Sequence, residues 1–219
     1  MAEKLISGDN HIDLTYLPPD LWSSEAPNKW KQLAPRVEEK DDGLHWFVDD
    51  QDRGMWNGIG PGFLPYQKGM FGHIDEMKDL GFEWNSRPGA KPRPTTPELR
   101  LADLDRDGLS AEIIYGCLMI NDLISEAPLR AWADKTYNDW VADFARRSDP
   151  NRVFPLAIIP NTDPMEAAAE VRRCAKIGLR GGDLAFKRMS PPLYTHEWYP
   201  LWEAAAECRF PISFHSTGF

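Results

Sequence analysis

The chain has 219 residues, 42% of them apolar and 27% charged, which is enough for one large domain with a sizeable buried core. The formal net charge is −9 without any block of Lys or Arg, so the composition argues against nucleic-acid binding and against an anionic membrane surface. No apolar run approaches the roughly 18 residues of a membrane span, and the N-terminus reaches charged residues and His11 without the apolar region of a secretory signal.

The first predicted strand is Leu5–Asp9, and a segment rich in turn-forming residues follows it. Residues 17–98 hold 10 of the 19 prolines and 9 of the 16 glycines, which break long elements. They also hold five of the nine tryptophans, which need a surface to pack on. We therefore expect an ordered, largely irregular insertion with one short strand at Leu44–Val48 and an extended connector at Arg87–Pro97.

From Thr96 onward, strands and helices alternate. Thr96, Pro97 and Glu98 have the order of an N-cap, a proline at the first helical position and an acidic first turn, and Gly108 is expected to end this helix. Ala111–Leu118 is an apolar run of strand length. The strongest helix signal follows, because one stripe of mostly apolar side chains recurs every three or four residues. The stripe consists of Leu129, Trp132, Thr136, Tyr137, Trp140, Val141 and Phe144.

The next predicted strand is Val153–Ile159, although Pro155 counts against a central position in a sheet. Asp163 and Glu166 have the spacing of a capping box, and they predict a helix that runs to Gly178. The last elements are a strand at Leu179–Phe186, a helix through Leu201, Trp202, Ala205 and Cys208, and a strand at Pro211–His215.

Alternating strands and helices predict an α/β fold with a parallel sheet. An open doubly wound sheet and a (β/α)8 barrel both fit, but no glycine-rich phosphate-binding motif follows any strand. We therefore predict a TIM-like barrel, of which residues 1–219 supply about the first five strands as a single domain, with residues 17–98 as an irregular insertion after strand 1. Five strands do not close a barrel, so we expect the protein to continue. An open sheet edge invites pairing, so we also expect the chain alone to form homo-oligomers or to be poorly soluble.

Three residues at strand ends are candidates for metal binding. Asp9 and His11 are two residues apart in a strand, so they project from the same face, and His215 ends the apolar strand that begins at Pro211. In a barrel, the carboxyl ends of the strands carry the active site. A carboxylate and two imidazoles suit a divalent ion, although a surface Asp and structural histidines remain alternatives. If Asp9 points away from the histidines, Asp13 becomes the candidate carboxylate.

The other polar candidates are less specific. The run Arg180–Asp183 contains two glycines, which permit either a ligand or a tight bend of the barrel, and Asp183 is a candidate for the barrel interior. His45, His73 and His196 are expected to be structural or exposed to solvent. The cysteines, Cys117, Cys174 and Cys208, form no CxxC pair and no disulfide framework, so we expect buried thiols in a cytoplasmic protein.

Several segments, taken in order and spacing, resemble a known family. They are Ile6–His11, Pro18–Trp22, Leu101–Gly108, Arg152–Pro160, Gly178–Gly181, Leu201–Ala205 and Pro211–His215. The chain resembles the amidohydrolase-related (amidohydrolase family 2) proteins of the aminocarboxymuconate-semialdehyde decarboxylase-like group, in the metal-dependent hydrolase superfamily. The likeness spans the chain except for residues 23–95.

The resemblance implies a distorted (β/α)8 barrel that holds one divalent metal ion, Zn²⁺ or Mn²⁺. In this family the first strand carries H-x-H, E-x-H or D-x-H ligands, and the third pattern matches Asp9 and His11. The histidine ligand on the fifth strand matches His215. Family members also use a histidine after the sixth strand and an aspartate after the eighth. Both positions fall beyond Phe219, so the catalytic and substrate-binding residues are not assigned within this chain.

The resemblance implies an enzyme that acts on a small molecule. We expect a nonoxidative decarboxylase (a carboxy-lyase) of an aromatic or conjugated carboxylic acid, because the aromatic-rich insertion favours a planar substrate. One alternative is a metal-dependent hydrolase of a C–N, C–O or C–C bond, in which the metal lowers the pKa of bound water to about 7. The other alternative is a non-catalytic, truncated barrel that serves as a binding module.

Overall fold

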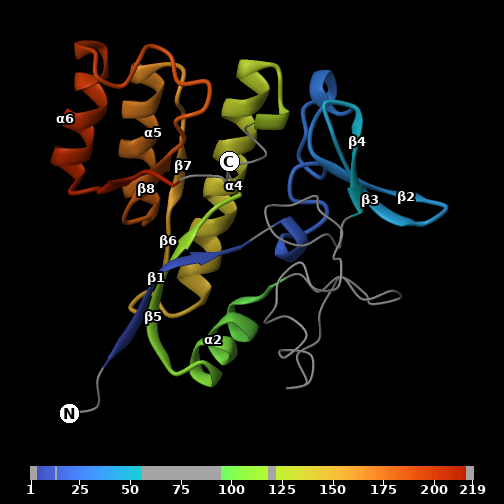
Figure 1. Cartoon of the computed structure of the whole chain (residues 1–219), viewed down its shortest axis with the longest axis horizontal. Helices are drawn as coiled ribbons and strands as arrows, with labels where there is room; N and C mark the ends of the chain where they lie inside the picture. The colour runs from blue at the N-terminus through green and yellow to red at the C-terminus, as the bar shows by residue number, and fades with distance from the viewer. Residues whose placement is uncertain (1–3, 13, 56–94, 118–121, 216–219) are drawn as a thin grey trace. The chain divides into compact units, whose positions relative to one another are not determined.

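The computed structural model describes residues 4–12, 14–55, 95–117 and 122–215 (Figure 1). The chain divides into two compact units: residues 1–12 together with 95–219, and residues 13–94. The first unit contains the alternating strands and helices, and the second contains a small antiparallel sheet. None of the helices in the described parts is long and apolar enough to span a membrane.

Parallel strands form the centre of the first unit. They are β1 (Leu5–His11), β5 (Leu109–Tyr115), β6 (Val153–Pro155), β7 (Ala157–Ile159), β8 (Gly182–Leu184) and β9 (Ile212–Ser213). β1 pairs with β5, β5 with β6, β7 with β8, and β8 with β9, and every pairing is parallel. Because only Leu156 separates β6 from β7, the strands follow one another in chain order, as the sequence predicted (Figure 1).

The predicted strand Val153–Ile159 is divided at Leu156, so the prediction of one continuous strand was wrong. The N–H of Leu156 donates to the carbonyl of Ile114 on β5, at 2.9 Å, and the N–H of Ala157 donates to Gly181, next to β8, also at 2.9 Å. The two halves of the segment therefore serve different neighbours. Pro155 is tolerated because it lacks the N–H at the point where this change of partner begins.

The amide of Asn138 completes the edge that β5 leaves open. Ile158 lies two residues beyond Leu156, so its polar backbone groups face the same side, where β5 has already ended at Tyr115. Asn138 accepts a hydrogen bond from the N–H of Ile158 at 2.8 Å and donates one to its carbonyl at 2.9 Å. A helix side chain thus takes the place of a neighbouring strand.

The strand predicted at Leu179–Phe186 shortens to β8, and its carboxyl end stops at Leu184 for a related reason. The amide of Asn161 donates to the carbonyls of Ala185 and Lys187, at 3.0 and 2.7 Å. These carbonyls are satisfied by a side chain and no longer join the ladder. The last strand likewise shortens from Pro211–His215 to β9.

In the described residues, four helices pack around these strands. They are α2 (Pro97–Arg106), α4 (Ala127–Arg147), α5 (Pro164–Ile177) and α6 (Tyr199–Cys208), and a 3-10 turn at His196–Trp198 precedes α6. The predicted caps are confirmed: the Thr96 side chain accepts from Leu99 N, and Asp163 accepts from the N–H groups of Met165 and Glu166. α4 contacts β6 and β7, α5 contacts α4 and β7, and α6 lies beside α5 (Figure 1).

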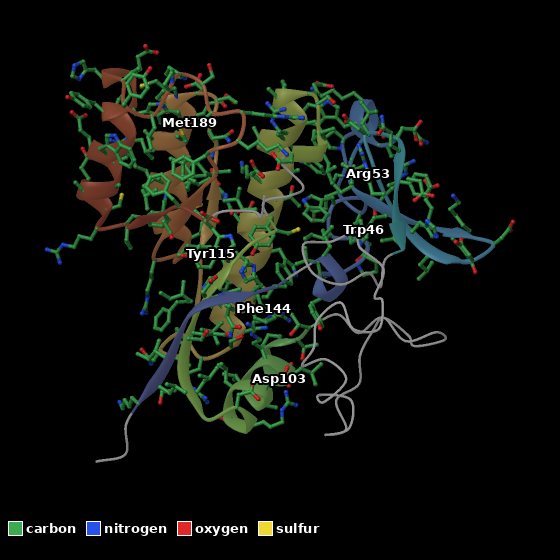
Figure 2. All side chains as sticks on the ribbon, viewed as in Figure 1. Trp46, Arg53, Asp103, Tyr115, Phe144 and Met189 are labelled. Atoms are coloured by element: carbon green, nitrogen blue, oxygen red, sulfur yellow. The ribbon has the colours of Figure 1, made fainter. Side chains whose placement is uncertain are left out.

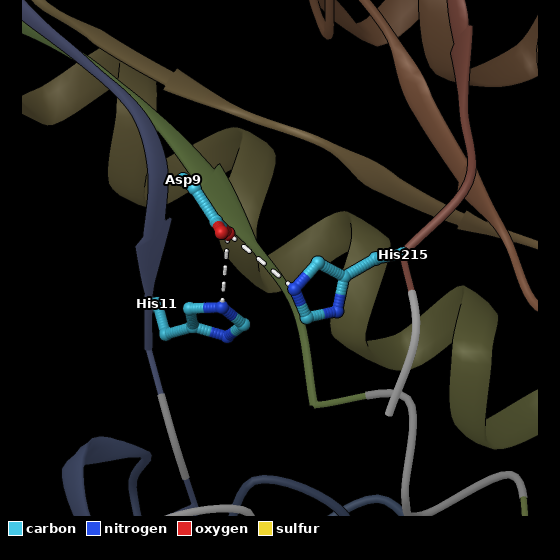
Figure 3. Close-up of side chains that lie close together, drawn as sticks. All are labelled: Asp9, His11 and His215. Atoms are coloured by element: carbon cyan, nitrogen blue, oxygen red, sulfur yellow. Dashed lines mark hydrogen bonds and ion pairs between the residues drawn. The ribbon is translucent and has the colours of Figure 1, made fainter. Parts of the chain in front are cut away.

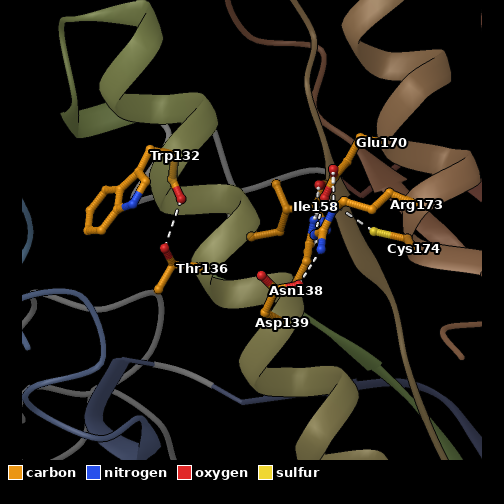
Figure 4. A network of polar contacts seen from close by, with 8 residues as sticks. All are labelled: Trp132, Thr136, Asn138, Asp139, Ile158, Glu170, Arg173 and Cys174. Atoms are coloured by element: carbon orange, nitrogen blue, oxygen red, sulfur yellow. Dashed lines mark hydrogen bonds and ion pairs between the residues drawn. The ribbon is translucent and has the colours of Figure 1, made fainter. Parts of the chain in front are cut away.

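A polar network joins α4 to α5 (Figure 4). Glu170 accepts two hydrogen bonds from Arg173, each at 2.7 Å, and one from Asn138 at 2.8 Å. Arg173 also pairs with Asp139. Burial acts to raise the pKa of Glu170, but the hydrogen bonds from Arg173 and Asn138 outweigh it and hold this pKa below its usual value. Burial also raises the pKa of the neighbouring Cys174 thiol, which therefore stays protonated.

The second unit has more regular structure than the sequence predicted. Its strands β2 (Arg36–Lys40), β3 (Gly43–Val48) and β4 (Gln51–Met55) form an antiparallel sheet, and short 3-10 turns lie at Leu14–Tyr16 and Asn28–Trp30. β3 confirms the strand predicted at Leu44–Val48. β2 and β4 were missed because charged side chains, and not an apolar alternation, dominate them. Trp56, His73, Trp84 and residues 87–94 of the predicted connector lie outside the described residues.

Replacing Asn138 by Ala removes both hydrogen bonds to Ile158 and one to Glu170. Because the Ile158 groups are buried, we expect a loss of about 2–4 kcal/mol in the free energy of unfolding, measured with urea. The matched control is Asn151→Ala, at an exposed turn residue, with an expected change within about 0.5 kcal/mol. Equal losses in the two variants would contradict the assigned role of Asn138.

The lowered pKa of Glu170 predicts a pH-dependent contribution to stability. A carboxylate whose folded pKa is depressed stabilises the fold above its unfolded pKa, about 4.3, and loses this effect as the pH falls. Glu170→Gln should therefore cost about 2 kcal/mol at pH 7, and the gap to wild type should narrow at pH 3.5. Urea unfolding at both pH values measures this, with the exposed Glu203→Gln as the control. A gap that is independent of pH would refute the prediction.

Candidate metal centre

Asp9 and His11 project from the same side of β1, close to its carboxyl end. The Oδ1 atom of Asp9 lies 3.3 Å from Nε2 of His11 (Figure 3). The two side chains are 68% and 35% exposed, so the pair is open to solvent. The predicted i, i+2 relation is therefore present.

His215 comes from the other end of the strand order, directly after β9 and Phe214. Its Nε2 atom lies 3.4 Å from the same Oδ1 atom of Asp9, so the carboxylate stands between the two imidazoles (Figure 3). One ligand atom from each of the three residues falls within 4.8 Å of the other two. The structure thus brings together three side chains, of which Asp9 and His215 are more than 200 residues apart in the sequence.

The spacing of these atoms fits a shared divalent ion. Two ligand atoms that each lie about 2.1 Å from a zinc ion, at the tetrahedral angle, are about 3.4 Å apart. The separations of 3.3 and 3.4 Å around Asp9 agree with this value. One oxygen and two nitrogen donors suit zinc or manganese, and partial exposure leaves room for a further ligand. Because Asp9 meets both histidines, the alternative carboxylate Asp13, which lies outside the described residues, is not needed.

Asp183 faces the same interior as this cluster. It is fully buried on β8, and its Oδ1 accepts a hydrogen bond from the backbone N–H of His215 at 3.2 Å. Its Oδ2 has no hydrogen-bond partner among the described residues. Burial raises the pKa of Asp183 to about 7, against the hydrogen bonds from the N–H groups of His215 and Leu184, and the nearby charge of Asp9 adds to the increase.

The glycines beside Asp183 provide close packing within the fold. A Cβ atom on Gly182 would lie 2.6 Å from the side chain of Ile159, and one on Gly181 would lie 2.9 Å from Leu156. Of the two alternatives that the sequence left open for this segment, the structure therefore supports tight strand packing. Arg180 is exposed and stacks over Phe154, with its guanidinium carbon 5.3 Å from the ring centre.

Tyr115 is a site residue that the sequence analysis missed. It ends β5, where β1 and β5 run side by side (Figure 2), and it is the register partner of His11. Its ring centroid lies 5.8 Å from that of His11 and 4.6 Å from that of His215. The signal that could have found it is the alternation along β5, because Ile113 and Tyr115 share one face and Tyr115 is the last residue of the strand.

β1 is held from the opposite face by a buried ion pair. Arg100 of α2 donates two hydrogen bonds to Glu112, at 2.7 and 2.6 Å, and the carboxylate of Glu112 is fully buried. The Asn10 amide donates to the same carboxylate at 2.5 Å, and Arg100 also donates to the carbonyl of His11 at 3.2 Å. The backbone that carries Asp9 and His11 is thus attached to α2 and β5.

The remaining histidines lie elsewhere. In the second unit, His45 is buried and its two ring nitrogens contact Asp42 and Asp52, at 3.0 and 2.9 Å. His196 is exposed and its ring meets Tyr199 edge-on. These positions match the expectation of structural or solvent-facing histidines, and His73 is not described.

The family model of the amidohydrolases matches residues 31–219, which is most of the chain. The chain belongs to the amidohydrolase family. His215 lies inside the matched range, whereas Asp9 and His11 precede it. The match confirms the family that the sequence motifs resembled.

The chain is also similar to a curated fungal protein and to solved structures. The decarboxylase orsB of Emericella nidulans is 26% identical over 164 residues, which are 74% of this chain and 43% of that protein. An amidohydrolase from Mycobacterium avium subsp. paratuberculosis has a TM-score of 0.71 at 16% identity, over 99% of this chain and 58% of that one. A dihydroxybenzoic acid decarboxylase from Polaromonas with bound manganese has a TM-score of 0.51 at 17% identity, over 97% and 49%.

These likenesses confirm the predicted fold. The solved structures are amidohydrolase barrels that cover nearly all of this chain, so its parallel strands form part of a TIM-like (β/α)8 barrel. The chain spans about half the length of the relatives that it matches.

Replacing Arg100 by Ala leaves the buried Glu112 carboxylate without its cationic partner. Breaking such a pair costs about 3–5 kcal/mol, so we expect a loss of this size in the free energy of unfolding, measured with urea. On the same helix, Arg106 pairs with Asp103 at the surface, and Arg106→Ala should cost at most about 1 kcal/mol. If Arg100→Ala costs no more than this control, the ion pair does not hold β1 in place.

Proposed function

We propose that the chain is part of a metal-dependent, nonoxidative decarboxylase of an aromatic or conjugated carboxylic acid. The observation that carries the proposal is the convergence of Asp9, His11 and His215 at the carboxyl ends of parallel strands. This is the end of a (β/α)8 barrel at which catalytic residues gather. Asp9, His11 and His215 are proposed as the ligands of one divalent ion, zinc or manganese.

The comparisons support this choice of reaction. The fungal relative is named a decarboxylase, and the Polaromonas decarboxylase of similar fold acts on a dihydroxybenzoic acid and holds manganese. A bound ion would supply a Lewis acid that polarises a substrate carboxylate or an adjacent hydroxyl. The side chains around it supply orientation: Asp9 lies between the imidazoles, and Asp183 holds the backbone of His215 at the mouth of the barrel.

The proposal extends to the setting of the enzyme. We place residues 1–219 in one barrel domain of a cytoplasmic protein that acts on small molecules and not on nucleic acid or a membrane. We also propose homo-oligomers. Leu5 and Ile6 on β1 are 59% and 60% exposed. The exposed rings of Phe186 and Phe214 stack on each other, with their centroids 4.8 Å apart. Apolar surface of this kind is covered by further strands of the barrel or by a second copy.

The test of the metal centre compares the purified full-length protein with its His11→Ala and His215→Ala variants, using elemental analysis and turnover of hydroxylated benzoic acids. We expect wild type to hold about one zinc or manganese ion, and each variant to bind it at least about a hundredfold more weakly, because a three-ligand site loses a ligand. Released carbon dioxide reports decarboxylation, and the exposed His196→Ala is the matched control.

The outcomes separate the alternatives. If either alanine variant keeps its metal and its turnover, that histidine is structural and the ligand assignment is wrong. If hydrolysis products form without release of carbon dioxide, the protein is a metal-dependent hydrolase and not a decarboxylase. A protein that binds metal but converts neither class of substrate would favour a binding module.

A further inference from the structure

The hydroxyl of Tyr115 makes a contact that reaches across the barrel. Its oxygen lies 2.6 Å from Oγ of Ser213, and either oxygen can be the donor. Tyr115 ends β5 and Ser213 belongs to β9, and these strands are not neighbours: β5 pairs with β1 and β6, whereas β9 pairs with β8. The hydrogen bond therefore joins the two ladders through the interior, and not along the sheet.

The ring of Tyr115 also packs against both imidazoles of the candidate metal centre. It is stacked on His11, with an interplanar angle of 27°, and tilted by 35° against His215. The two imidazoles meet edge-on, with their centroids 4.8 Å apart. The three rings thus form one cluster. Among the described residues, Ser213 is the hydrogen-bond partner of the Tyr115 hydroxyl.

This arrangement restricts motions that the ligand contacts leave free. The contact of Asp9 with one ring nitrogen fixes the position of that atom, but the imidazole can still turn about the contact. A flat aromatic ring against each imidazole limits this rotation, and a hydrogen bond at the hydroxyl limits the rotation of the tyrosine itself. Ser213 precedes His215 by two residues and both contact Tyr115, so the hydrogen bond to Ser213 holds the tyrosine ring beside His215.

We propose that Tyr115 and Ser213 act together as a brace that holds the rings of His11 and His215 facing Asp9. Both are positioning residues, since they act on a bound ion or substrate through the histidines. The proposal rests on the proposed function for its purpose, but the orientation of the rings can be measured in the metal-free protein.

The first test uses Ser213→Ala and the NMR signals of the imidazoles in the metal-free protein. The substitution removes one oxygen on β9 and changes neither histidine nor the tyrosine ring. If Ser213 acts through Tyr115, releasing the phenol alters its ring current at His11, which lies on β1 at the other end of the strand order. We expect the His11 and His215 signals to shift or broaden in Ser213→Ala and to stay unchanged in the control Tyr194→Phe, at an exposed tyrosine. Unchanged His11 signals in Ser213→Ala would overturn the brace.

The second test measures the affinity for Mn²⁺ in a double-mutant cycle. Tyr115→Phe and Ser213→Ala each remove one half of the same hydrogen bond, so each should weaken binding by about tenfold, as for other groups that orient metal ligands. The double variant should be no weaker than either single variant. Tyr115→Leu also removes the flat ring, so it should weaken binding by a larger factor than Tyr115→Phe does.

The results distinguish the brace from the metal assignment. One outcome is that wild type binds Mn²⁺ and that Tyr115→Phe and Ser213→Ala bind it as tightly as wild type does, with only the KM for the substrate raised. This outcome would make Tyr115 a substrate contact and overturn the brace. Fully additive losses in the double variant would also overturn it. Wild-type protein that shows the imidazole shifts of Ser213→Ala but binds no metal would support the brace and refute the proposed function.

Discussion

A single amide side chain allows one strand segment to serve two ladders. Residues 153–159 pair with β5 as far as Leu156 and with β8 from Ala157 onward, and Asn138 bonds the backbone of Ile158 where β5 has ended. Without such a partner, a buried N–H and a buried carbonyl would remain unpaired, at a cost of about 1–3 kcal/mol each. Asp9 and His11 belong to one ladder and His215 follows the other, so the candidate metal centre depends on this junction.

Local signals in the sequence predicted most of the parallel-strand unit. The caps at Thr96 and Asp163 need only residues within one turn, and the alternation of strands and helices needs only short windows. The division at Leu156 could not be found in this way, because it depends on where two other strands begin and end. Asn138 does not belong to the stripe that predicted α4, and because its partner Ile158 is 20 residues away, no signal within the helix marks it.

The candidate site shows the same limit. Asp9 and His11 were predicted because two residues apart in a strand means one face, and His215 because it ends an apolar run. Tyr115 lies within the strand predicted at Ala111–Leu118 and was not singled out. Its contacts with two histidines and with Ser213, 98 residues away, join strands that are not neighbours, and the alternation along β5 indicates only which face Tyr115 shares with Ile113. In residues 17–98, β2 and β4 escaped prediction because they lack an apolar alternation; the two strands flank β3, and their charged side chains form ion pairs such as Lys40 with Asp52.

One face of β1 attaches the strand to its neighbours, and the other face carries the candidate metal ligands. Asn10 and the carbonyl of His11 are bonded to Glu112 and Arg100 on the helix side, whereas the side chains of Asp9 and His11 project to the other side. The attachment of the strand therefore does not involve the carboxylate of Asp9. The side chain at position 9 can therefore be replaced without breaking the contacts that attach β1 to α2 and β5.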